Sequence, residues 1–243
     1  MKKSVLKKPT DIKDVFGAFL VENAQFSTGK YDMPVVRSNI DELPTSLFSY
    51  QKVGKRKLSL PPRTALHFFN YDYIFDGKYG IWNALIRGVE FERGFNLKKL
   101  EGFDCIIAPD FSLYLDMPLA WQIWNVYRSR VVVYALQELG YKVIVNARWT
   151  DVASYEFCFE GIEEKSIVAV GSYGCSNKLE DRKLFDSGLV ELIKRVKPDA
   201  IVIYGTITDS MKDILEKNNQ KYYVFRSDTS VAMEEHCHGN ESK

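Results

Sequence analysis

Two predicted strand ends carry the side chains of this sequence that are best suited to chemistry. Asp110 and Asp116 follow the strand predicted over 104–108, and Arg148 follows the strand predicted over 142–146. Two neighbouring carboxylates can hold a divalent cation or divide the roles of acid and base, and a guanidinium group suits a phosphate or carboxylate. We expect Asp110, Asp116 and Arg148 to be the catalytic groups. The structural alternatives are a turn residue, a helix cap and an Asp110–Arg148 ion pair.

Six further residues are expected to bind a ligand around these groups. They lie at strand ends, on a polar stripe of a long helix, or in a glycine-containing turn: Asp72, Ser112, Asn125, Asn146, Trp149 and Ser172. Two turns, at 171–177 and 205–210, combine glycine with small hydroxyl residues before a helix, a pattern that binds phosphate through backbone N–H groups. Neither has the spacing of a Walker or dinucleotide-binding motif. Together they favour an anionic ligand, and a divalent cation is the one cofactor that the carboxylates suggest.

Histidine and cysteine give little support to nucleophilic hydrolysis. His67 lies inside an apolar strand, which is typical of a core histidine, and Cys105 and Cys158 have apolar neighbours that would raise a thiol pKa. The Glu-Glu-His-Cys-His run at 234–238 lacks the second ligand pair of a zinc site. The cysteines show no C-x-x-C spacing, which indicates reduced thiols in the cytoplasm.

Strands and helices must alternate to position these residues. Strands are expected over 64–71, 104–108, 142–146, 166–170, 200–204 and 222–225, with helices between them. The alternation predicts an α/β fold with a parallel sheet of about six strands flanked by helices. An open, doubly wound, Rossmann-like sheet is the first expectation, and an incomplete TIM-like β/α barrel is the alternative. In both, ligands bind at the carboxyl ends of the strands.

The longest predicted helix, over 117–139, joins the two strands that carry the candidate site. Asp116 is its expected N-cap, Pro118 falls in its first turn, and Gly140 takes the left-handed position after its last turn. One polar stripe crosses its apolar surface, formed by Gln122, Asn125 and Ser129. We interpret the stripe as a partner surface or as one wall of the site.

Three segments are expected along the chain: an arm over 1–62 packed on the core, an α/β core over 63–226, and a disordered tail over 227–243. A formal net charge of +1 gives no general attraction to nucleic acid or to acidic membranes. No apolar run approaches the roughly 20 residues of a membrane span, and the basic N-terminus lacks the apolar stretch of a secretory signal. We therefore expect a cytoplasmic protein that does not bind membranes.

Four sequence motifs resemble a known family. They are P-D-F-S-L-Y-L-D-M-P-L-A-W-Q-I-W-N-V-Y-R-S-R from Pro109, N-A-R-W from Asn146, Y-E-F-C-F-E-G-I from Tyr155 and S-I-V-A-V from Ser166. In these motifs the chain resembles the bacterial and phage family called domain of unknown function 4417, over about 16–225. The resemblance implies an intracellular protein of a bacterium, plasmid or prophage. It implies no activity, since the family has none assigned, so every role given above comes from the residues themselves.

Three functions remain open, and the sequence does not decide whether the protein is an enzyme. The first is binding, or acting on, a nucleotide-like or other phosphorylated small molecule. The second is nucleic-acid binding for the replication or maintenance of a mobile element, through the basic cluster at 52–57 and the aromatic Tyr71 and Tyr73. The third is a protein-interaction module that inhibits a host system or serves it as an adaptor, with a patch around Trp121 and Trp124 or on the arm. We favour the first because polar groups gather at the strand ends.

Overall fold

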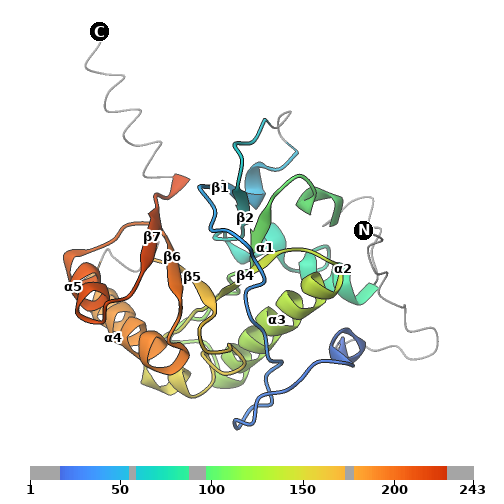
Figure 1. Ribbon diagram of the computed structural model, residues 1–243. Helices are drawn as coiled ribbons and strands as arrows, with labels where there is room; N and C mark the ends of the chain where they lie inside the picture. The colour runs from blue at the N-terminus through green and yellow to red at the C-terminus, as the bar shows by residue number, and fades with distance from the viewer. Residues whose placement is uncertain (1–16, 55–58, 88–96, 173–177, 229–243) are drawn as a thin grey trace.

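A single parallel sheet organises the molecule (Figure 1). The computed structural model describes residues 17–54, 59–87, 97–172 and 178–228. The strands of the sheet are β1 (Ser46–Ser49), β2 (Thr64–His67), β3 (Cys105–Ile107), β4 (Val143–Asn146), β5 (Ile167–Gly171), β6 (Ala200–Tyr204) and β7 (Tyr222–Phe225). The α-helices of the described residues are α1 (Asp72–Phe75), α2 (Ile81–Arg87), α3 (Leu119–Glu138), α4 (Leu179–Val196) and α5 (Asp209–Lys217). Short 3₁₀ helices are η1 (Ala18–Val21), η2 (Tyr50–Lys52), η3 (Leu97–Leu100) and η4 (Val152–Glu156).

The order of the strands decides between the two predicted arrangements. The predicted parallel α/β sheet with flanking helices is confirmed, and its seven strands lie side by side in chain order. A doubly wound sheet reverses its strand order at a switch point, and this sheet has no such reversal. The alternative prediction, an incomplete β/α barrel, therefore describes the arrangement. The sheet curls into a nearly closed barrel, and β1 is the strand that the sequence-based count of six omits.

The inside of the curled sheet has its own small apolar core. Its buried members come from the five inner strands: Ala65, Cys105, Ile107, Ile144, Ala169 and Val202. Leu47 of β1 and Phe225 of β7 pack against this cluster from the two edge strands. A larger core lies on the outer side of the sheet, where it includes residues of α2, α3, α4 and α5. The five inner strands are almost wholly buried because both of their faces are covered.

The segment before β1 closes one end of the barrel. Ile40 and Leu43 pack into the inner core. The Ser38 hydroxyl accepts a hydrogen bond from the backbone N–H of Val145 at 2.8 Å, and Asn39 Oδ1 accepts one from Val143 at 2.7 Å. In Figure 1 this blue segment passes across the sheet on its way to β1. The division of the chain at residue 62 stays a prediction, and β1 lies on the arm's side of it.

Helix α3 starts later than the sequence predicts. Pro118, and not Asp116, occupies the N-cap position, and no side chain caps this end. Asp116 is exposed in the preceding turn, so its expected capping role is wrong. The extended backbone at Pro118 delays the helix until Leu119. Gly140 does take the predicted left-handed conformation after the last turn, with φ of 86°.

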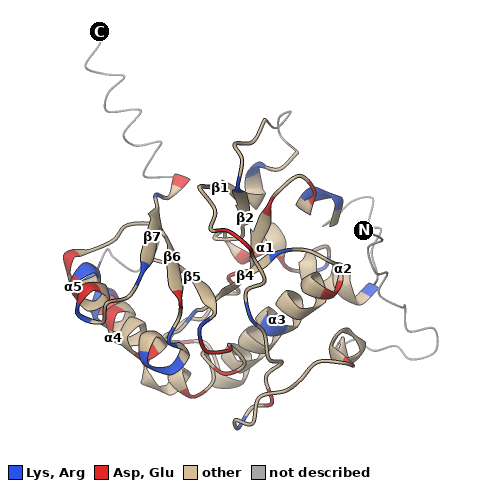
Figure 2. Cartoon of the chain, in the orientation of Figure 1, with Lys and Arg blue, Asp and Glu red and all other residues tan. Residues whose placement is uncertain are grey.

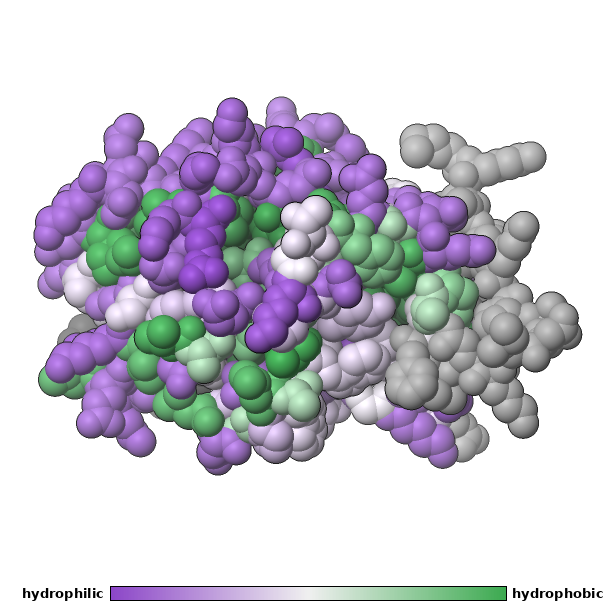
Figure 3. All heavy atoms as spheres, turned by 90° about the horizontal axis from the view of Figure 1, so that it is seen from below, coloured by the Kyte–Doolittle hydropathy of each residue, from purple (hydrophilic) through white to green (hydrophobic). Residues whose placement is uncertain are grey.

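The surface mixes charged and apolar groups. Acidic and basic residues are interspersed along α4 and α5 (Figure 2). On the face seen from below, hydrophobic residues show as separate groups between hydrophilic ones (Figure 3). Trp121 is 56% exposed, whereas Trp124 packs edge-on against Trp82, so the two predicted patch residues do not form one exposed surface. Within the described ranges, none of the helices has both the length and the apolar character needed to cross a lipid bilayer.

Candidate functional site

A cavity of about 510 Å³ lies at the carboxyl ends of the strands. Every strand contributes a lining residue at or just after its end: Gln51, Asn70, Asp110, Arg148, Gly171, Tyr204 and Asp228, in the order β1 to β7. Its volume lies within the roughly 300–1,000 Å³ of small-molecule sites. Its position is the one at which β/α barrels place their active sites. The cavity is therefore the candidate site of this protein.

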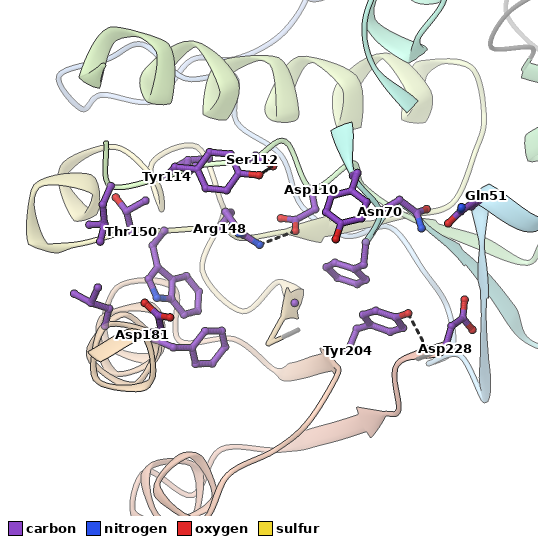
Figure 4. Close-up of a pocket in the computed structure, with 18 residues that line it drawn as sticks. Gln51, Asn70, Asp110, Ser112, Tyr114, Arg148, Thr150, Asp181, Tyr204 and Asp228 are labelled. Carbon is purple, nitrogen blue, oxygen red and sulfur yellow. Dashed lines mark hydrogen bonds and ion pairs between the residues drawn. The ribbon is translucent and has the colours of Figure 1, made fainter. Parts of the chain in front are cut away.

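Asp110 and Arg148 form an ion pair on the cavity wall. Arg148 Nη1 donates to Asp110 Oδ2 at 3.0 Å (Figure 4). Asn146 Nδ2 donates to Asp110 Oδ1 at 2.8 Å. The Asp110 side chain is 9% exposed and that of Arg148 is 24% exposed. Asp110 thus forms an ion pair and also lines the cavity, although the sequence presented these two roles as alternatives. A largely desolvated pair of this kind offers a ligand a hydrogen-bond acceptor beside a donor.

A small residue at the end of β5 lets neighbouring side chains approach the pair. A Cβ atom on Gly171 would lie 2.8 Å from Phe69 Cδ1 and 3.6 Å from Asp110 Oδ2. Heavy atoms at the first of these distances overlap, so a larger residue here would displace the Phe69 ring. Gly171 therefore keeps space open where the cavity meets Asp110.

The loop that carries Asp110 is held by a network of buried and half-buried polar side chains. Asp72 accepts hydrogen bonds from Ser112 N and Ser112 Oγ at 3.2 and 2.9 Å, and Asn125 Nδ2 donates to the Ser112 carbonyl at 2.7 Å. Arg128 donates to Asn125 Oδ1 at 2.6 Å and pairs with Asp76 at 2.8 Å. Burial raises the pKa of Asp72, against the two hydrogen bonds from Ser112 that lower it. The network fixes the loop after β3 from both α1 and α3.

A buried arginine fixes the end of β4. Arg130 is 1% exposed and donates to three backbone carbonyls, those of Asn146, Cys158 and Glu160, at 3.2, 2.6 and 3.2 Å. Burial lowers its pKa to about 10. Because Asn146 is the last residue of β4, these bonds help to set the direction in which Asn146 and Arg148 leave the sheet.

Aromatic rings form much of the remaining cavity wall. Phe69 stacks on Tyr204 with ring centroids 4.9 Å apart, and Trp149 packs against Phe185 at 5.0 Å. His67 lies behind this wall, 4.4 Å from Tyr204, where burial lowers its pKa to about 4. His67 Nδ1 accepts a hydrogen bond from the backbone N–H of Phe69, so the imidazole is a neutral part of the core.

The predicted site residues divide into three groups. Asp110, Ser112, Arg148 and Trp149 line the cavity. Asn146 stands behind it and holds Asp110, whereas Asp72 and Asn125 hold the loop. Asp116 and Ser172 lie outside the lining: Asp116 is exposed, and the buried Ser172 hydroxyl donates to the Thr206 carbonyl at 2.7 Å. Asp116 thus lies in an exposed turn and Ser172 is engaged by the backbone, so neither belongs to the site.

Sequence reasoning missed several cavity residues. These are Gln51, Phe69, Asn70, Leu113, Tyr114, Leu115, Thr150, Asp181, Leu184, Phe185, Tyr204 and Asp228, while Tyr71 was expected only as a contact to nucleic acid. Tyr204 ends a predicted strand and Asn70 lies next to the end of another, so the strand-end rule could have found them. Gln51 and Asp228 follow β1 and β7, and they were assigned to the arm and the tail.

Metal and thiol chemistry receive no support from the described part of the chain. Its residues include no group of three or more His, Cys, Asp or Glu side chains that could hold a metal ion. Cys105 and Cys158 are buried, and burial raises the pKa of each thiol to about 12. The residues at 55–57, 173–177 and 234–238, which carry most of the basic cluster, part of one predicted phosphate turn and the His-Cys run, lie outside the described residues.

Comparisons with known proteins place the chain in a family. The chain is 33% identical over 181 residues to the Gene 1 protein of Mycobacterium phage D29, covering 74% of this chain and 63% of that protein. It is 34% identical over 181 residues to the Gene 1 protein of Mycobacterium phage L5, covering 74% of each. The chain thus spans less than two thirds of the D29 protein, and no solved structure matches it. The family model described as Domain of unknown function (DUF4417) matches residues 25–223, and the chain therefore belongs to this family.

Proposed function

We propose that this protein binds, or acts on, a nucleotide-like small molecule in the cavity at the strand ends. The observation that carries the proposal is the Asp110–Arg148 pair on the wall of a cavity of about 510 Å³ whose lining also includes six aromatic residues. A few fixed polar groups among apolar and aromatic side chains are typical of small-molecule sites. A phosphorylated molecule without a base is the other ligand of this class.

The roles of the two charged residues follow from their geometry. Asp110 has two protein donors on its carboxylate and faces the cavity, so it can accept a hydrogen bond or a proton from a bound ligand. Arg148 can donate to a ligand oxygen or ring nitrogen beside that acceptor. The setting that we propose is the cytoplasm of a bacterium carrying a phage or another mobile element, because two relatives are phage proteins.

Thermal unfolding with added ligands tests the proposal. The panel contains the four common nucleoside monophosphates, with and without magnesium, and two sugar phosphates. A ligand at 100 times its Kd stabilises the folded state by about 2.7 kcal/mol. We expect a shift with at least one nucleotide, lost in Asp110→Asn and Arg148→Met and kept in Asp116→Asn, whose exposed carboxylate lies outside the cavity.

Circular dichroism of the variants separates binding from folding. If Asp110→Asn and Arg148→Met are folded and still bind the nucleotide with the wild-type affinity, the proposed site is wrong. If both variants unfold, the pair is structural and the proposal fails in the same way. A lack of any shift over the whole panel also contradicts it.

Nucleic-acid binding is the second candidate, favoured by one observation at the mouth of the cavity. Tyr71 and Tyr73 are 67% and 80% exposed and stack on one another, with centroids 5.8 Å apart and planes at 11°. Exposed rings of this kind stack on unpaired bases. The measurement is binding of a short single-stranded oligonucleotide, which should weaken steeply with salt and in Tyr73→Ala. Binding that is independent of salt would exclude this function.

A further inference from the structure

The charges on the cavity wall act differently on the phosphate group of a nucleotide and on its uncharged base. Among the described residues, four charged ones line the cavity: Arg148, Asp110, Asp181 and Asp228. The charge of Arg148 is offset by Asp110 at 3.0 Å, and that of Asp228 by Lys52 at 2.7 Å. Asp181 forms no ion pair with another described residue. The wall therefore has an excess of negative charge, which repels a phosphate group.

The described helix starts that follow the two predicted phosphate turns do not change this balance. The first turn of α4 contains Glu180 and Asp181, whose carboxylates already interact with the positive end of the helix dipole. At the start of α5 the Thr208 hydroxyl accepts a hydrogen bond from the N–H of Met211, and Asp209 lies in the first turn. Neither described helix start therefore offers an uncompensated positive end to an anion.

The same wall suits an uncharged planar ring. The Asp110 carboxylate and the Arg148 guanidinium lie side by side, so they present an acceptor next to a donor (Figure 4). The edge of a nucleobase presents the complementary pattern, an amino group next to a ring acceptor, and Asp and Arg read such edges in nucleic acids. Aromatic residues such as Trp149 and Phe185 supply apolar surface for the ring.

We infer that the cavity takes the uncharged base, or the whole nucleoside, and that a phosphate group weakens binding. The bases that fit carry an amino group beside a ring acceptor, as cytosine, adenine and guanine do. The amino group donates to Asp110, and the ring acceptor takes a hydrogen bond from Arg148. This inference rests on the proposed function, because it names the ligand of the same cavity.

Isothermal titration calorimetry on the full chain tests the inference. Cytidine, adenosine, guanosine and uridine are compared with their 5′-monophosphates at low and high salt. We expect at least one amino-bearing nucleoside to bind about tenfold more tightly than its monophosphate at low salt, the factor expected for about 1.4 kcal/mol of like-charge repulsion. High salt should narrow this ratio, because ions screen the repulsion.

A pair of acid-to-amide variants locates the repulsion. In Asp181→Asn, the affinity for the monophosphate should come closer to the affinity for its nucleoside. In Asp209→Asn, which changes an exposed acid on α5 outside the lining, the ratio of the two affinities should keep its wild-type value. A monophosphate that binds more tightly than its nucleoside would overturn the inference and leave the proposed function standing. If neither kind of ligand binds, the proposed function falls as well.

Discussion

Asn146 donates from its side-chain nitrogen Nδ2 to Oδ1 of Asp110 across 2.8 Å, and this contact fixes the direction of the amide. The other end of the amide, Asn146 Oδ1, is buried and has no hydrogen-bond partner among the described residues. If the amide were turned over, its oxygen would face the Asp110 carboxylate. Neither the carboxylate nor the amide oxygen would then have a donor at this contact. The orientation of Asp110 is thus maintained by a residue that leaves one of its own polar atoms unsatisfied.

Asn146→Asp should be strongly destabilising at neutral pH. The change replaces a donor by a second carboxylate against Asp110 in a place where Asn146 is 2% exposed. We expect the free energy of unfolding to fall by about 3–5 kcal/mol at pH 7, as for an uncompensated buried charge. The loss should shrink at pH 4, because one of the two carboxyl groups then takes up a proton.

Urea unfolding of the variant at the two pH values checks this expectation. Asn218→Asp, at an exposed position after α5, is the matched control and should change stability by less than about 1 kcal/mol. Equal losses in the two variants would show that Asn146 does not control the charge balance around Asp110.

Arg128→Met should remove the support of the loop after β3. Arg128 pairs with Asp76 at 2.8 Å, with side-chain exposures of 10% and 16%, and its guanidinium lies 4.2 Å from the centroid of the Phe111 ring. Removing one partner of a buried pair typically costs about 3–5 kcal/mol. The matched change Arg63→Met breaks an exposed pair with Glu42 and should cost less than about 1 kcal/mol. Chemical denaturation compares the two, and similar small losses would contradict a structural role for Arg128.

Gly188→Ala should destabilise the protein, although alanine favours a helix by about 1 kcal/mol over glycine. A Cβ atom at Gly188 would lie 2.0 Å from Trp149 Nε1, so the indole ring has to move. We expect a net loss of about 1–3 kcal/mol and weaker ligand binding, because Trp149 lines the cavity. Ser187→Ala, one position earlier on the exposed face of α4, should be neutral or slightly stabilising. A gain in thermal stability with Gly188→Ala would mean that the indole ring of Trp149 moves without a loss of stability.

His67 should make the protein less stable as the pH falls towards 4. Burial lowers its folded-state pKa from 6.5 to about 4, with Asp228 opposing and Lys52 adding to the shift. Between these values the unfolded chain binds a proton that the folded chain does not, so stability rises with pH over this window and is complete above about 6.5. The shift corresponds to about 3 kcal/mol between pH 4 and pH 7.

The measurement is the free energy of unfolding across pH 4 to pH 7 for the wild type and for His67→Gln. Carboxyl groups titrate in both proteins, so the difference between the two curves isolates His67. In the variant, the free energy of unfolding should rise less steeply with pH than in the wild type. Two parallel curves would show that the imidazole titrates alike in the folded and unfolded states.

The sequence predicts the sheet better than it predicts the lining of the site. Apolar runs such as 142–146 and 200–204 mark buried parallel strands, and the residues after them reach the cavity because parallel strands end at one edge. The short strand β1 was missed, since its four residues lie among prolines and carry little apolar signal. Whether the sheet curls and closes depends on contacts between distant segments, which spacing along the chain does not reveal.

The errors at single site residues have local causes. Asp116 and Asp110 have the same type and similar positions after β3, yet only Asp110 faces the cavity, because Ser112 in this loop donates a hydrogen bond to Asp72 and accepts one from Asn125. Ser172 resembles a phosphate-binding residue in the sequence, but its hydroxyl donates a hydrogen bond to the Thr206 carbonyl. Three-dimensional hydrogen bonding decides both cases, and no pattern in the sequence encodes it.

The cavity wall begins with Gln51 and ends with Asp228, while Lys52 and Asp228 join the loops after the two edge strands at 2.7 Å. During synthesis, the N-terminal strands leave the ribosome long before the last one. In a nascent chain that stops before Asp228, the cavity wall is therefore incomplete, even when the first six strands have paired. The lining of the cavity is complete only in a chain that includes β7 and the loop after it, so the ligand binding that we propose should distinguish chains translated past Asp228 from shorter ones.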